Sequence, residues 1–206
     1  MSAILPPVPR LIGVSESDRS PADLRADVPP SVSVGVVVWL ASELMFFSGL
    51  FAAYFTLRAA TVTWPPVGVE LATARTGAAT VVLVASSFTM HLAVRAGERD
   101  DRTGVVRWLS LTALLGLLFL GNQAWEYAQV PFSISSHAYG SMFFIMTGFH
   151  GLHVLGGILF MAAVIGMISG RGSRAPVATT VRVCGYYWHF VDVVWVAMFA
   201  TIYLIQ

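Results

Sequence analysis

Two ionisable side chains stand three residues apart near the end of the chain, inside a stretch that is otherwise apolar. His189 and Asp192 belong to the string YYWHFVDVVW, and their spacing places both on one face of a helix. A charged group in the middle of a bilayer costs about 3 kcal/mol or more, so it normally faces protein and has a partner. The first question is therefore which groups meet His189 and Asp192.

Three more candidates lie in other apolar stretches, namely Glu43, His150 and His153. The HxxH spacing of the two histidines also occurs in metal and haem sites, but such a pair needs further ligands, which could come from Glu43, His189 or Asp192. Hydrogen bonding between helices and participation in a proton relay are the alternatives. A buried Glu43 could exchange protons, or fix helix packing in its neutral form. We expect no metal in this chain.

The composition indicates an integral membrane protein. Of the 206 residues, 56% are hydrophobic and only 11% are charged, with a mean hydropathy of +0.73. Soluble domains are about 25% charged. The net charge of +1 gives no reason to expect nucleic acid as a partner. The single cysteine, Cys184, excludes an intrachain disulfide and a metal site built from several cysteines.

The hydropathy pattern predicts a tail followed by a membrane domain. Residues 1–31 combine prolines and charges with little apolar periodicity, so we expect a cytoplasmic tail there. Residues 32–206 are expected to form an all-α bundle of five transmembrane helices, since a span needs roughly 20 apolar residues. Charged or proline-containing links separate the expected helices, which run about 34–57, 77–94, 106–127, 139–168 and 183–205.

The arginines predict how the bundle is oriented. Five spans alternate their links between the two sides, and the tail, the second-to-third link and the fourth-to-fifth link hold ten of the twelve basic residues. Only Arg58 and Arg75 fall on the other side. The positive-inside rule therefore places the N-terminus in the cytoplasm and the C-terminus outside.

This orientation converts sequence position into depth. Glu43 lies roughly 14 Å from the cytoplasmic end of its helix, and Asp192 lies roughly 15 Å beyond Arg182. His150 and His153 fall near the middle of the fourth helix. These groups and His189 thus share one slab near the midplane, where they could form a single network.

Three residues are expected at the membrane interface instead. Glu126 lies roughly 28 Å along the third helix, where its side chain can reach into water. Trp64 stands beside two prolines in the first link, and Trp125 precedes Glu126. Tryptophan is enriched at membrane interfaces, so we assign both indoles to that level.

Four strings together resemble subunit III of the haem-copper oxidases, in the order and spacing of that family. They are SELMFF at Ser42–Phe47, QAWEY at Gln123–Tyr127, GFHGLHV at Gly148–Val154 and YWHFVDVVW at Tyr187–Trp195. The family usually has tyrosine where Trp125 stands. The similarity covers about residue 31 to the C-terminus and is greatest to the short, five-helix form of actinobacterial aa3-type cytochrome c oxidases, which lacks the first two helices of longer members.

The resemblance implies a subunit without redox centres in a complex that reduces O2 to water and pumps protons in aerobic respiration. Subunit I of such complexes carries haem a, haem a3 and copper B, and subunit II carries copper A. This chain would hold no cofactor apart from bound phospholipid. It would support proton uptake, turnover stability and access of lipid or oxygen. Glu43 matches the family's carbodiimide-reactive carboxyl, and His150, His153 and Asp192 match its midplane polar groups.

The implied partners are subunit I by direct contact, subunit II, small subunits and membrane lipids, with a cytochrome bc1-type complex as a supercomplex partner. The implied location is the bacterial plasma membrane, as a multi-pass protein. A quinol oxidase subunit III is the alternative within the family. An autonomous transporter is the more remote one, and it predicts inverted repeats or broken helices, neither of which the sequence has. In this interpretation, His189 and Asp192 fasten the last helix, and Glu43 is the better functional candidate.

Overall fold

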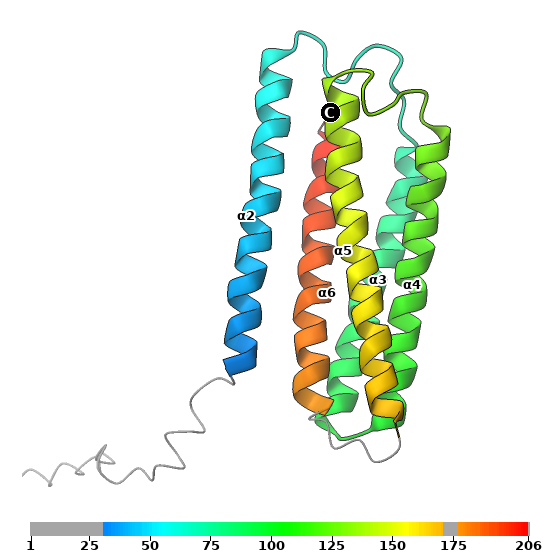
Figure 1. Ribbon diagram of the computed structural model, residues 1–206. Coiled ribbons are helices and arrows are strands. Elements are labelled where there is room, and N and C mark those ends of the chain that lie inside the picture. Colours follow the sequence, from blue (N-terminus) through cyan, green and yellow to red (C-terminus); the bar gives the residue numbers. More distant parts are fainter. Residues whose placement is uncertain (1–30, 171–176, 206) are drawn as a thin grey trace, which may run out of the picture. The chain divides into compact units, whose positions relative to one another are not determined.

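The computed structural model describes residues 31–170 and 177–205. This part of the chain is all-α, as expected, and five of its helices are long and apolar enough to cross a membrane. The expected tail lies outside the described residues except for Ser31, so its extent stays a prediction. The elements are α2 (Ser31–Ala60), α3 (Thr73–Glu98), α4 (Arg102–Gln129), α5 (Ala138–Ser169) and α6 (Val177–Phe199), which continues as the short π-helix η2 (Ala200–Leu204) (Figure 1).

The helices begin and end where the sequence offers caps and breaks. The Asp101 carboxylate accepts a hydrogen bond of 2.8 Å from the Gly104 amide and so caps α4. The His137 Nδ1 atom accepts one of 2.8 Å from the Gly140 amide at the start of α5. Both bonds satisfy an amide that has no partner within the first turn. Pro131 follows α4 closely and cannot continue that helix.

Helices α3 to α6 pack in a closed ring within residues 38–205. Helix α3 contacts α4 and α6, and α5 contacts the same two helices. Trp188 of α6 is fully buried at the centre, and its indole lies against Gly116 of α4 and Gly157 of α5. The Trp188 Nε1–H donates to the Ser86 hydroxyl of α3 at 2.9 Å. This one side chain therefore contacts the other three helices of the ring.

Helix α2 contacts the ring through a few side chains and is the least buried of the five spans. Trp39 stacks on Tyr187 with ring centroids 5.4 Å apart. Further along, the Tyr54 hydroxyl donates to the Thr201 carbonyl at 3.3 Å and accepts from the Trp64 indole at 2.9 Å. One apolar side of α2 is added to these aromatic and polar contacts. Its residues that belong to the buried core or pack against it are Phe47, Tyr54, Leu40, Leu50, Phe51 and Leu57.

Polar contacts identify which links share an end of the bundle. Arg182 donates to the Glu98 carboxylate at 3.2 Å, which joins the start of α6 to the end of α3. Arg58 at the end of α2 donates to the Ile205 carbonyl at 3.0 Å. The arginine-rich links and the C-terminus therefore lie at opposite ends. Which end faces the cytoplasm stays a prediction.

Candidate functional site

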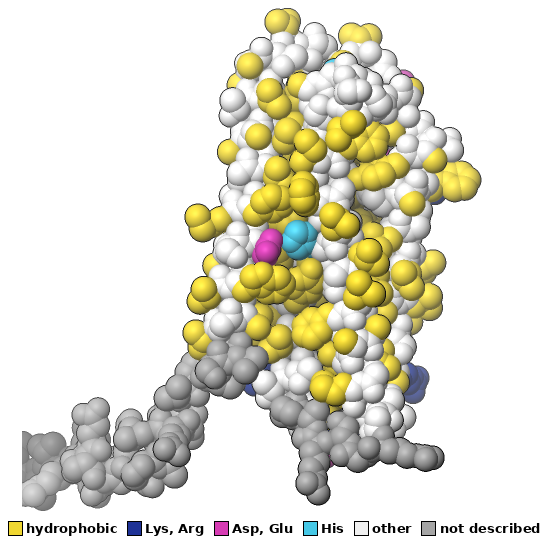
Figure 2. Space-filling model, viewed as in Figure 1, with side chains coloured by type: hydrophobic (Ala, Val, Ile, Leu, Met, Phe, Trp, Pro, Cys, Tyr) yellow, Lys and Arg dark blue, Asp and Glu magenta, His cyan; other side chains and the backbone are white. Residues whose placement is uncertain are grey.

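Glu43 of α2 and His153 of α5 form a hydrogen-bonded pair. Glu43 Oε2 lies 3.1 Å from His153 Nε2, and the two side chains are 24% and 16% exposed. Figure 2 shows an acidic and a histidine side chain together in the middle of a face that is otherwise hydrophobic. The Glu43–His153 pair connects α2 to the helix ring at mid-height, and both side chains are partly exposed at the surface.

The hydrogen bonds of His153 define how many protons the pair holds. Its Nδ1 atom lies 2.7 Å from the Phe149 carbonyl oxygen, which can only accept, so Nδ1 carries a hydrogen. The bond between His153 Nε2 and Glu43 Oε2 then contains one further proton. That proton belongs either to the acid, giving two neutral groups, or to the imidazole, giving an ion pair. Either way the pair has no net charge, and its proton can move between two defined atoms.

A second cluster joins α6 to α3. The Ser87 hydroxyl donates to Asp192 Oδ2 and lies 2.9 Å from His189 Nδ1. Because a hydroxyl has a single hydrogen, Ser87 must accept from His189 if it donates to Asp192. Asp192 is buried, and its Oδ1 atom has no hydrogen-bond partner among the described residues. Sequence reasoning missed Ser87, although a serine in the middle of a membrane span is itself a sign of a polar partner.

His150 takes part in neither cluster. Its ring lies between Phe119 of α4, at 5.9 Å between centroids, and Trp195 of α6, at 4.9 Å. Both of its nitrogens are buried without a hydrogen-bond partner in the described structure. His150 therefore points into the interior of the ring of helices α3 to α6, while His153 points to α2. The HxxH pair thus does not converge on one centre. The described residues contain no group of three His, Cys, Asp or Glu side chains that could hold a metal ion.

The Glu126 carboxylate differs from the sequence expectation. Its side chain is only 5% exposed and does not extend into water. The Glu126 Oε2 atom accepts hydrogen bonds from Thr76 at 3.1 Å and Tyr203 at 2.9 Å. These hydroxyls come from α3 and η2, so Glu126 joins three elements near one end of the bundle. The structure differs from the expected water-exposed side chain because distance along a helix says nothing about which way a side chain points around it. The interfacial level of Glu126 stays a prediction.

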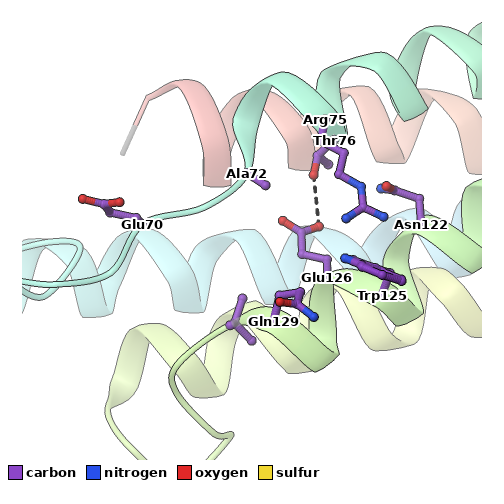
Figure 3. A pocket seen from close by; sticks show the side chains of 9 residues that line it. Glu70, Ala72, Arg75, Thr76, Asn122, Trp125, Glu126 and Gln129 are labelled. Atoms are coloured by element: carbon purple, nitrogen blue, oxygen red, sulfur yellow. Dashed lines mark hydrogen bonds between the residues drawn. The ribbon is translucent and has the colours of Figure 1, made fainter.

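A cavity of about 100 Å³ lies beside Glu126, between the start of α3 and the end of α4. Glu126 Oε1 and Asn122 Nδ2 are buried there without a partner in the described part of the chain. Arg75 and Trp125 also line this cavity, and the Arg75 guanidinium lies over the Trp125 indole, 4.9 Å from the ring centroid (Figure 3). Trp125 is 56% exposed, whereas Trp64 is half-buried. The interfacial positions of these two indoles stay predictions.

The midplane residues thus occupy three separate environments rather than one direct network. Glu43 bonds His153, His189 and Asp192 share Ser87, and His150 is enclosed by aromatic rings. The first pair lies on α2 and α5 and the second cluster on α3 and α6. Glu43 and His153 are the two sequence candidates from different helices that the structure joins by a hydrogen bond.

Comparisons with known proteins cover nearly the whole chain. Residues 19–206 match the family described as "Cytochrome c oxidase subunit III". A protein of Nocardia farcinica named "Probable cytochrome c oxidase subunit 3" is 50% identical, over 86% of this chain and 90% of its own length. "Cytochrome c oxidase subunit 3" of Corynebacterium diphtheriae is 47% identical over the same shares. The protein of that name from Thermostichus vulcanus is 39% identical over 84% and 86%.

The family match spans the residue numbers of every described helix of the bundle. The coverage of both this chain and its relatives leaves no large part of either unmatched. The described helices also agree with a multi-pass membrane protein. The chain belongs to the cytochrome c oxidase subunit III family.

Proposed function

We propose that this chain is the non-redox subunit III of an aa3-type cytochrome c oxidase in a bacterial plasma membrane. It packs against the subunit that carries haem a, haem a3 and copper B, and is assembled with a copper A subunit and smaller subunits. The proposal is carried by one observation. A relative named "Probable cytochrome c oxidase subunit 3" is 50% identical to this chain over 90% of that relative's length. In this proposal, the complex reduces O2 and this chain supports the reaction.

The Glu43–His153 pair is the part of the chain best placed to act on protons. It holds one transferable proton between Glu43 Oε2 and His153 Nε2 at mid-membrane height. The pair is neutral as a whole, so it can remain in an apolar environment, and it stays neutral if a proton gained by one of its groups is matched by a proton released from the other. We infer that it buffers or relays protons for the adjoining subunit during turnover, which sustains rapid uptake and delays inactivation.

The other polar clusters support a structural role. The Ser87 cluster and Glu126 each join helices by hydrogen bonds, and those of the Ser87 cluster lie at a level where lipid tails offer no substitute. We place the arginine-rich end in the cytoplasm by the positive-inside rule, and the Arg182–Glu98 contact joins two of its links. Bound phospholipid would cover the exposed apolar side chains that no neighbouring subunit covers.

Affinity purification from the native membrane tests the membership of the complex. A tag on this chain should recover a haem a spectrum together with a subunit that contains copper A. Recovery without haem would contradict the assignment, and recovery with haem but no copper A subunit would favour a quinol oxidase.

The role of Glu43 is tested separately by Glu43→Gln. This variant keeps a hydrogen-bonding side chain but removes the acidic proton. We expect normal assembly and haem spectrum, with a shorter active lifetime or slower proton uptake during turnover. Glu98→Gln makes the same chemical change at the end of the bundle and should behave like the wild type. Equal lifetimes and uptake rates for both variants would leave Glu43 with a packing role alone.

A further inference from the structure

The arginine-rich end of the bundle has a hollow of about 410 Å³ between the start of α4 and the end of α5. Two guanidinium groups, two hydroxyl groups and two aliphatic side chains line it, namely those of Arg102, Arg107, Thr103, Ser169, Val106 and Ile168. Arg102 and Val106 lie one helical turn apart, as do Thr103 and Arg107, so α4 presents two neighbouring rows of side chains to it. We call these six residues the α4–α5 hollow.

The α4–α5 hollow lies at the level of the lipid headgroups. Helix α4 has 28 residues and α5 has 32, so the two helices are about 42 Å and 48 Å long. Because the hydrocarbon core is about 30 Å thick, their ends extend roughly 6–9 Å beyond it when each helix is centred in the membrane. Arg102 is the first residue of α4, and Ser169 is the last of α5. Val106 lies about 6 Å further in, at the border of the core.

The charges of the two arginines distinguish the hollow from its surroundings. Among the described residues, neither Arg102 nor Arg107 has an ion pair or a side-chain hydrogen bond. The Arg107 guanidinium lies 5.6 Å from the centroid of the Trp108 ring, a contact that uses no oxygen acceptor. At the same end of the bundle, Arg182 instead bonds the Glu98 carboxylate at 3.2 Å. The hollow therefore carries two positive charges that can receive an anion.

A phosphate group suits these charges. A guanidinium presents its N–H donors in a planar fork that matches two oxygens of a phosphate. The hydroxyls of Thr103 and Ser169 line the same hollow and can donate to the same group. The neighbouring acid, Asp101, is held at the Gly104 amide as the cap of α4 and does not line the hollow.

The depth and the aliphatic walls favour a lipid over a soluble anion. Val106 and Ile168 would contribute nothing to the binding of free phosphate. In a phospholipid, the acyl chains begin close to the phosphate and run inward, past Val106. A lipid without net charge also carries a cationic amine or choline group, which two guanidinium groups would repel. An anionic phospholipid brings the phosphate and the chains without that cation.

We propose that the α4–α5 hollow binds the headgroup of an anionic phospholipid such as phosphatidylglycerol. Arg102 and Arg107 hold the phosphate, and the acyl chains run along α4 and α5 toward the core. Basic pockets between transmembrane helices recognise anionic headgroups in this way. This inference deepens the bound phospholipid of the proposed function, and it rests on that function for the membrane setting.

Site-specific photo-crosslinking in native membranes tests which molecule occupies the hollow. A photoreactive residue replaces Ser169, which is exposed at its edge. After irradiation, mass spectrometry identifies the adducts. We expect anionic phospholipids to be at least threefold more abundant among the adducts than in the membrane as a whole. Protein adducts in place of lipid, or lipid adducts in the proportions of the membrane, would overturn the proposal.

Charge variants test the role of the arginines in the same crosslinking background. Arg102→Gln and Arg107→Gln each remove one charge from the hollow. Arg95→Gln removes one from α3 at the same end and serves as the control, because Arg95 does not line the hollow. The purified complex in neutral detergent is titrated with phosphatidylglycerol, and the adduct yield is measured. We expect each hollow variant to need roughly fivefold more lipid, and the control to match the wild type. Equal shifts for all three variants would overturn the site.

Two further titrations separate the lipid from its parts. Phosphatidylcholine has the same phosphate and acyl chains but no net charge, so it should give at least threefold less adduct at equal concentration. Inorganic phosphate at the concentration of the lipid should leave the capture of phosphatidylglycerol nearly unchanged, because it lacks the acyl chains. Equal capture of the two lipids would reject the preference for anionic lipid. Displacement by inorganic phosphate would identify a site for a soluble anion and overturn the proposal.

The failures of this proposal and of the proposed function are distinguishable. Haem that co-purifies with the tagged chain, combined with no enrichment of anionic lipid at position 169, rejects the lipid site and leaves the subunit assignment intact. Enrichment at position 169 in a preparation without haem rejects the assignment and retains the lipid site.

Discussion

Replacing Gly157 with alanine would place a Cβ atom against the central indole of the bundle. That atom would lie 2.8 Å from Cε3 and 2.9 Å from Cζ3 of Trp188. Carbon atoms prefer about 3.5–4.0 Å, so the overlap is roughly 0.7 Å. The indole cannot move away easily, because Gly116 lies against its Cη2 and Cζ2 atoms and the Nε1–H is bonded to Ser86 at 2.9 Å.

Overpacking of this kind costs about 1–3 kcal/mol. Alanine also has a higher helix propensity than glycine by about 1 kcal/mol, which offsets part of the loss. Gly166→Ala isolates that second effect, because the new Cβ atom would have no atom within 4 Å and Gly166 lies in the same helix. We therefore expect Gly157→Ala to be clearly less stable than Gly166→Ala, which should match or exceed the wild type.

Thermal unfolding in detergent measures the difference, with near-ultraviolet circular dichroism reporting on the buried tryptophans. The midpoint of Gly157→Ala should lie roughly 3–9 °C below that of Gly166→Ala, which has the same gain in helix propensity, if a change of 1 kcal/mol corresponds to about 3 °C for a chain of this size. Adding Trp188→Phe should lower stability by less than the sum of the two single changes, since the smaller ring leaves room for the methyl group. Identical midpoints for the two alanine variants would refute the packing argument.

Three other substitutions probe the polar contacts. Asp192→Ala strands its serine and histidine partners at a cost of about 1–3 kcal/mol, so immunoblots should show little chain in the membrane; a normal amount would contradict this. Glu126→Leu should lower the unfolding midpoint more than Glu126→Gln, which keeps an oxygen for the two hydroxyl donors; the reverse order would argue against the buried contacts. Tyr54→Phe removes the hydroxyl that Trp64 bonds, so limited proteolysis of the α2–α3 loop should accelerate, and unchanged cleavage would make that bond dispensable.

The helical part of this fold is readable from the sequence because a membrane span requires a long apolar run. The third expected helix, 106–127, lies inside the observed α4; Asp101 marks where that helix begins, and Pro131 explains why it ends. The π-helical turn at Ala200–Leu204 was not predicted, since its residues continue the same apolar pattern.

The partners of the polar residues were harder to predict than their depths. His150 and His153 differ by roughly 60° around the helix axis, which is enough for one to face the ring and the other α2. The partner of Asp192 is a serine on α3, more than a hundred residues earlier in the chain. A single sequence gives depth along each helix but neither its rotation nor its neighbours, so Ser87 and the hydroxyl partners of Glu126 could be found only in three dimensions.

Removal of this chain from the purified oxidase tests the central claim most directly. If this chain supports the reaction without holding a redox centre, depletion should leave the haem spectrum and the initial rate of O2 reduction nearly unchanged. The activity should then decay over fewer turnovers than in the intact complex, and adding the chain back should restore its lifetime. Loss of haem, or an initial rate that falls in proportion to the amount of chain removed, would contradict the account.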